Sequence, residues 1–102
     1  MYKNVKCEKR IMGKLQYGDD LLEAMLGVCK EEGITAGSFE LMGALSRVKL
    51  AYYDQAEKKY TPCFESETGC EITSCIGNIS LKDNTIFVHG HMTVSDKNGK
   101  VH

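Results

Sequence analysis

The sequence lacks the features that mark several large classes of protein. Tryptophan is absent and proline occurs once, at Pro62. No apolar run approaches the roughly 18 residues that a membrane-spanning helix requires. Residues 1–8 hold no apolar segment of the kind that directs secretion. We therefore expect no membrane association and a cytoplasmic location.

A surplus of positive charge is also missing. The chain carries 13 Lys and Arg residues against 14 Asp and Glu residues, which gives a formal net charge of −1. No run of Lys or Arg forms a basic tail. Proteins that bind DNA phosphates usually carry a basic excess, because each neutralised phosphate releases counterions. The composition therefore predicts DNA binding that is at most weak, non-specific and easily disrupted by salt.

The remaining composition is typical of one small globular domain. The 102 residues are 42% apolar and 26% charged, which fits a single folded unit spanning 1–102. Five cysteines are an odd number, and no two of them form a C-x-x-C pair. Without a secretory signal, this favours reduced thiols, most of them packed as small apolar side chains.

The spacing of apolar residues predicts an α+β fold. Residues 5–15 alternate between apolar and charged side chains, as a half-buried strand does. Residues 20–32 have an apolar stripe at helical spacing, which predicts a helix. Asp20 would cap its N-terminus, and Gly33 would end it in the left-handed conformation.

Strand patterns fill the rest of the chain. The expected strand segments are 38–54 with a break at 43–47, then 60–64, 71–81 as a central strand and 85–94. Polar turns at 54–59, 82–84 and 96–99 join them. Hairpin connections imply a mixed, mainly antiparallel sheet with one main flanking helix.

The segment from Phe87 to Thr93 is the most informative for chemistry. On a strand, His89 and His91 point to the same face with origins roughly 7 Å apart, so their imidazoles can converge on one metal ion. Zinc or another divalent transition metal would need a third and a fourth ligand. Gly90 adds no side chain to the opposite face, which indicates a close approach there. The alternative is that both histidines are ordinary polar residues of an exposed strand.

Four further residues are candidates for lining a pocket around the pair. Strand alternation places Phe87 and Thr93 beside the histidines, Glu71 offers a carboxylate, and Arg10 lies on the polar face of the first expected strand. The sequence contains no phosphate-binding loop, dinucleotide fingerprint or nucleophile elbow. A helix-turn-helix is excluded because only one helix of adequate length is expected.

Several segments in order resemble the plants-and-prokaryotes conserved (PPC) domain over residues 8–101. They are Gly18–Leu22, Glu31–Phe39, Gly43–Ser46, Ala51–Asp54 with Lys59–Tyr60, Glu71–Ile72 with Gly77–Ser80, and Val88–Asp96 with Gly99–Val101. The resemblance implies a homotrimer. In plants this domain is fused to AT-hook segments that bind the DNA minor groove, and this sequence contains no AT-hook.

The PPC fold in turn resembles acetolactate decarboxylase, in which a His-x-His pair and a further histidine hold a catalytic zinc ion. His89 and His91 match that pair, whereas His102 does not match the further histidine by position. The resemblance implies that residues 1–102 stop before the last strand of the family. Two functions remain open: a DNA-associated regulatory module, or a metal-binding pocket for a small molecule with lyase-like activity. The residues do not decide whether the protein is an enzyme.

Overall fold

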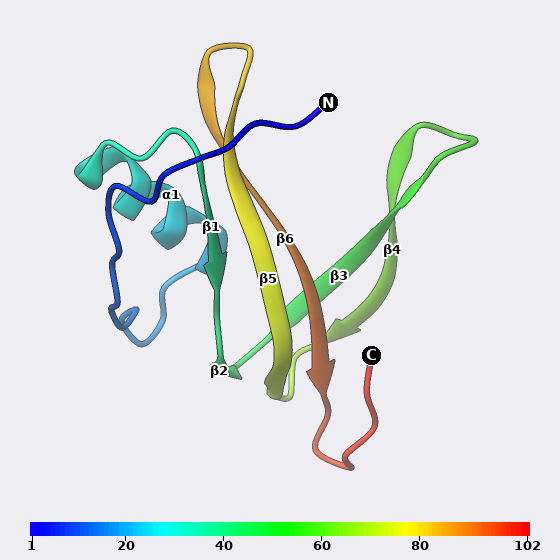
Figure 1. Ribbon diagram of the computed structural model, residues 1–102. Helices are drawn as coiled ribbons and strands as arrows, with labels where there is room; N and C mark the ends of the chain where they lie inside the picture. The colour runs from blue at the N-terminus through cyan, green and yellow to red at the C-terminus, as the bar shows by residue number, and fades with distance from the viewer.

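A computed structural model describes all residues, 1–102 (Figure 1). Its elements, in chain order, are α1 (Leu21–Glu32), β1 (Gly37–Glu40), β2 (Gly43–Leu45), β3 (Val48–Asp54), β4 (Lys59–Ser66), β5 (Cys70–Lys82) and β6 (Thr85–Ser95). Every pairing between these strands is antiparallel. The expected α+β class, with one helix and a mainly antiparallel sheet, is confirmed. Its helix lacks the length and apolar character that crossing a membrane demands.

Helix α1 begins and ends where the sequence predicts. The Asp20 carboxylate accepts a hydrogen bond from the backbone N–H of Glu23 at 3.0 Å, which satisfies one of the free donors of the first turn. Gly33 takes the left-handed conformation, with φ 68° and ψ 32°, and its N–H bonds to the Cys29 carbonyl. One face of the helix packs toward β6, and Cys29 is its buried residue.

Strand β5 is the centre of the main sheet, as predicted for 71–81. Strands β1 and β2 pair along one edge of β5, and β6 pairs along the other for its whole length. Asp83 and Asn84 join β5 to β6 with φ values of 51° and 61°. Two positive φ values in a two-residue loop fit the twist of a tight hairpin.

The core is small and lies on the helix side of this sheet. Its buried side chains are Cys29, Cys70, Cys75, Ile79 and Val94. Three of the five cysteines are therefore buried as expected, whereas Cys7 and Cys63 are exposed. Burial raises the pKa of the Cys29 and Cys75 thiols, so both are poor nucleophiles.

The break predicted at 43–47 is only partly right, because Gly43–Leu45 form strand β2 of the main sheet and residues 46–47 alone separate the two sheets. Strands β3 and β4 pair only with each other and extend away from the main sheet as a hairpin (Figure 1). The hairpin contacts the C-terminal end of the chain through Phe64 of β4. The Phe64 ring stacks on the His102 imidazole with ring centroids 3.7 Å apart.

The expected strand at residues 5–15 is wrong. Residues 1–20 contain no strand, and Val5 and Ile11 are exposed. Alternation indicates which side chains a strand would bury, but it supplies no pairing partner. The segment pairs with none of the strands and is instead held beside α1 by an ion pair of 3.1 Å between Lys9 and Glu32. Arg10 consequently lies on an irregular, exposed segment.

The fold exposes far more surface than a compact chain of its size. Its accessible surface is 8635 Å², against about 5,800 Å² for a folded monomer of this mass. The radius of gyration is 15.1 Å, against about 13 Å for a compact domain of this length. Large surfaces of the sheet and of the β3–β4 hairpin are therefore free to contact other protein.

Candidate functional site

Strand β6 brings the two predicted histidines together. His89 and His91 lie on the same face of the strand, and their Nε2 atoms are 3.2 Å apart. Their ring centroids are 5.1 Å apart, with planes inclined at 68°. Two nitrogens bound to one tetrahedral zinc ion, each at about 2.05 Å, lie about 3.3 Å apart. The separation suits two ligands of one ion, and it equally allows the Nε2–H of one ring to donate a hydrogen bond to the Nε2 of the other.

The surroundings of the pair follow from the pairing of β5 with β6. Asn78 lies opposite His89, and Ile76 lies opposite His91. Phe87 precedes them on the same face, with its ring centroid 6.1 Å from that of His89. His89 is half-buried and His91 is exposed, so a ligand can approach from solvent. This face of the sheet is the one opposite α1.

The face toward α1 shows what a side chain would meet at the glycine between the histidines. A β-carbon added at Gly90 would lie 3.4 Å from the Phe39 ring and 3.8 Å from the Cys75 sulfur. These are ordinary van der Waals distances, so the packing at Gly90 is not close enough to require glycine. Gly77, directly opposite on β5, is packed more tightly, because an added β-carbon would overlap both the Phe39 ring and the His89 carbonyl oxygen. Sequence reasoning missed Gly77, since its neighbour is known only once β1 is placed against β5.

The other predicted residues do not all gather at the pair. Thr93 shares the histidine face, and its hydroxyl hydrogen-bonds with that of Thr73 at 2.7 Å. Arg10 makes no hydrogen bond or ion pair in the structure and lies on the exposed N-terminal segment. Glu71 pairs with Ser95, four residues beyond His91 and therefore roughly 13 Å along the strand.

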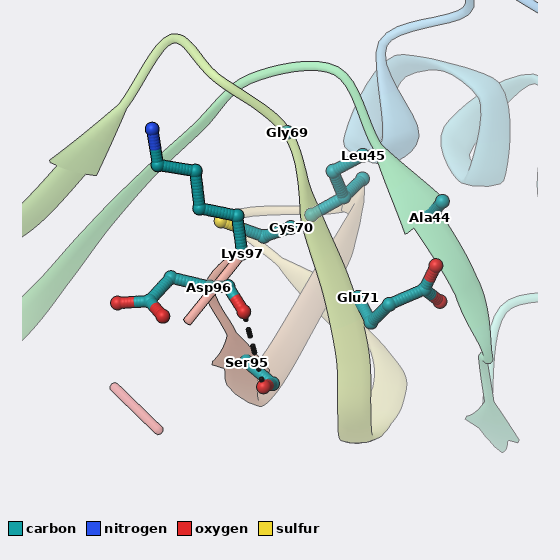
Figure 2. Close-up of a pocket in the computed structure, with 8 residues that line it drawn as sticks. All are labelled: Ala44, Leu45, Gly69, Cys70, Glu71, Ser95, Asp96 and Lys97. Carbon is teal, nitrogen blue, oxygen red and sulfur yellow. Dashed lines mark hydrogen bonds between the residues drawn. The ribbon is translucent and has the colours of Figure 1, made fainter. Parts of the chain in front are cut away.

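Glu71 instead belongs to a shallow opening at the far end of the sheet. The opening has a volume of about 260 Å³, and its lining residues are Ala44, Leu45, Gly69, Cys70, Glu71, Ser95, Asp96 and Lys97. In Figure 2 the Glu71 and Asp96 carboxylates point away from each other, and the Lys97 chain turns outward. The opening thus presents no converging set of polar groups.

His102 does not join the His89–His91 pair and interacts with other residues. Its Nε2 atom lies 2.9 Å from the Asp96 carboxylate, and its ring stacks on Phe64. This hydrogen bond from His102, with those from the Lys100 and Asn98 backbone N–H groups, lowers the pKa of Asp96. A carboxyl whose pKa is lowered by folding stabilises the fold above its unfolded pKa, and that contribution is lost as the pH falls through the lowered value.

The chain therefore offers two imidazoles that could act as metal ligands at this site. No group of three His, Cys, Asp or Glu side chains lies within reach of one ion. Two converging neutral imidazoles fit half of a tetrahedral or octahedral site. The rest of the coordination sphere would come from outside the chain.

The fold and the site together define a class: an α+β domain with one helix on one face of an antiparallel sheet and a His-x-His strand on the other. The family model of the Plants and Prokaryotes Conserved (PCC) domain, also abbreviated PPC, matches residues 2–102. The chain belongs to this family. No curated protein matches its sequence.

Three of the solved structures of chains similar to this one are each described differently. A PPC protein from Pyrococcus horikoshii is 33% identical, with a TM-score of 0.81 over 86% of this chain and 61% of its own. A metal-containing protein from Archaeoglobus fulgidus is 33% identical, with a TM-score of 0.79 over 96% of this chain and 72% of its own. A putative DNA-binding protein from Bacteroides thetaiotaomicron is 28% identical, with a TM-score of 0.73 over 80% of this chain and 57% of its own. This chain thus spans about six tenths of the length of the Pyrococcus horikoshii and Bacteroides thetaiotaomicron proteins.

Proposed function

We propose that this chain is a PPC module that binds a divalent transition-metal ion between His89 and His91 and presents it to a small-molecule ligand. The observation that carries the proposal is the 3.2 Å separation of the two Nε2 atoms. The similarity to a metal-containing protein over nearly the whole chain supports it. The five free thiols suit work in a reducing cytoplasm.

The residues of this chain would hold and orient the ion. Each imidazole must be neutral and must offer the lone pair of Nε2. The strand fixes the backbone origins of both rings, because His89 and His91 are paired with Asn78 and Ile76 of β5. A bound divalent ion would polarise an oxygen of a ligand, which is the chemistry of both ligand sensing and lyase-like catalysis.

The test is a zinc titration by calorimetry after dialysis against a chelator. We expect one zinc ion per chain at pH 7.5 and loss of binding below about pH 6, because protonation of imidazole competes with the metal. The absence of any heat of binding at pH 7.5, with no zinc retained after gel filtration, would contradict the proposal.

We further propose that the module works as a homotrimer. The chain exposes roughly 2,900 Å² more than a compact monomer of its mass, which lies in the range that permanent interfaces bury. Copies packed together would cover this surface and could supply the missing ligands. Light scattering at micromolar concentration should give three times the chain mass. A clean monomer mass would refute the assembly.

DNA association is the second candidate, because two similar structures, from Bacteroides thetaiotaomicron and Ralstonia eutropha, are of putative DNA-binding proteins. The net charge of −1 predicts that any such binding by this chain is weak and non-specific. A gel shift at physiological salt should therefore show no nanomolar complex. A sequence-selective nanomolar complex would make DNA binding the primary function.

A further inference from the structure

A row of four side chains runs along the histidine face of β5 and β6. The Lys82 ammonium lies 5.2 Å from the Phe87 ring centroid, and that ring lies 6.1 Å from the His89 imidazole, with planes inclined at 26°. His91 ends the row. A charge, an aromatic ring and a pair of nitrogen ligands therefore follow one another on a single exposed surface.

The charge in this row has no partner in the two strands that carry it. Lys82 is the only Lys or Arg in β5 and β6, and Glu71, the only acidic residue in them, lies at the opposite end of β5. Lys82 forms no ion pair. Its neighbours on this face, Ser80 and Asn78, are neutral. Asp83 follows Lys82 in the turn but forms no ion pair with it, so the ammonium is free to meet a negative group.

The ring in the row is also unusual for an exposed strand. Phe87 keeps 38% of its surface exposed, and no residue of the described core covers it. An aromatic ring beside an ammonium group binds flat, electron-rich molecules well, since stacking and the cation act on the same partner. Ser80, directly opposite Phe87 on β5, is small enough to leave the ring accessible.

We propose that Phe87 and Lys82 are the ligand-binding half of the histidine site, and that its ligand is a planar aromatic acid. The ring of the ligand lies against Phe87, its acidic group meets the Lys82 ammonium, and its far edge reaches His89. This inference rests on the proposed function for the place of the ligand beside the metal.

The charge pattern favours a small acid over a nucleic acid strand. Single-stranded nucleic acids need a basic groove that follows many phosphates, in addition to rings on which bases stack. One lysine in two strands, in a chain of net charge −1, supplies a single counter-charge. A molecule with one acidic group matches this single positive charge.

The experiment is a calorimetric titration of the full chain with 2-naphthoate, with and without one equivalent of zinc. Two matched probes separate the causes: 2-naphthamide keeps the flat rings without the charge, and decahydro-2-naphthoate keeps the charge without flatness. We expect 2-naphthoate to bind more tightly than either. Lys82→Met should weaken 2-naphthoate by about threefold to fivefold, and Phe87→Leu by about fivefold to tenfold.

Zinc affinity should be unchanged in both variants, because neither side chain is a metal ligand, and Lys97→Met serves as a control for the loss of one charge. If zinc binds while 2-naphthoate and 2-naphthamide bind equally, or both variants leave 2-naphthoate affinity intact, the ligand inference fails and the metal site stands. If zinc does not bind while 2-naphthoate binding depends on Phe87 and Lys82, the metal proposal alone fails. An oligothymidylate that outcompetes 2-naphthoate at physiological salt would overturn the ligand class.

Discussion

Zinc affinity is expected to fall by more than about 100-fold when either His89 or His91 is replaced by alanine. Mutation of a residue that only hydrogen-bonds to a metal ligand already lowers metal affinity by about 10-fold to 100-fold, and loss of a ligand itself costs more. The reason is geometric. Only these two imidazoles converge, with Nε2 atoms 3.2 Å apart, and no third side chain of the chain can replace one of them. Calorimetry at pH 7.5 measures the effect.

His102→Ala is the matched control for this experiment. It removes the third histidine, which bonds to Asp96 and stacks on Phe64 away from the pair. Zinc affinity should survive that change. If the two strand variants retain zinc as well as the parent does, or if His102→Ala loses it to the same extent, the metal site lies elsewhere and the His89–His91 pair is ordinary strand surface.

Gly77→Ala is expected to destabilise the fold severely. The new β-carbon would overlap the Phe39 ring and the His89 carbonyl oxygen, so β1, β5 and β6 would all have to shift. Overpacking of a core typically costs about 1–3 kcal/mol, and contact with backbone places this case at about 3 kcal/mol or more. For a chain of this size, that lowers the melting temperature by roughly 12 °C or more. Thermal melting followed by circular dichroism provides the measurement.

Gly90→Ala is the control, because Gly90 faces Gly77 across the two strands and meets the same ring. Its added β-carbon would stand 3.4 Å from Phe39, which a small movement of the ring relieves. We expect a change within about 1 kcal/mol, since alanine also restricts the unfolded chain. Equal melting temperatures for Gly77→Ala and the parent would show that the Phe39 ring does not lie on the glycine pair.

The sequence by itself determined the features that depend on neighbouring residues. Asp20 and Gly33 set the ends of α1 because a cap acts within one turn. Asp83 and Asn84 set the β5–β6 hairpin because its turn needs two positive φ values. The same-face placement of His89 and His91 follows from the two-residue period of a strand. Half of the candidate site was therefore predictable without any tertiary contact.

The tertiary structure alone decided which distant segments meet. Alternation at 5–15 predicted a strand, but the folded chain pairs that segment with no sheet edge. Glu71 qualified as a ligand by residue type, yet the register of β5 against β6 places it opposite Ser95. Phe39 lies on Gly77 only because β1 pairs with β5, a strand more than 30 residues further along the chain. The turn sets the register within the β5–β6 hairpin, whereas the pairing of β1 with β5 depends on long-range contacts that no local pattern contains.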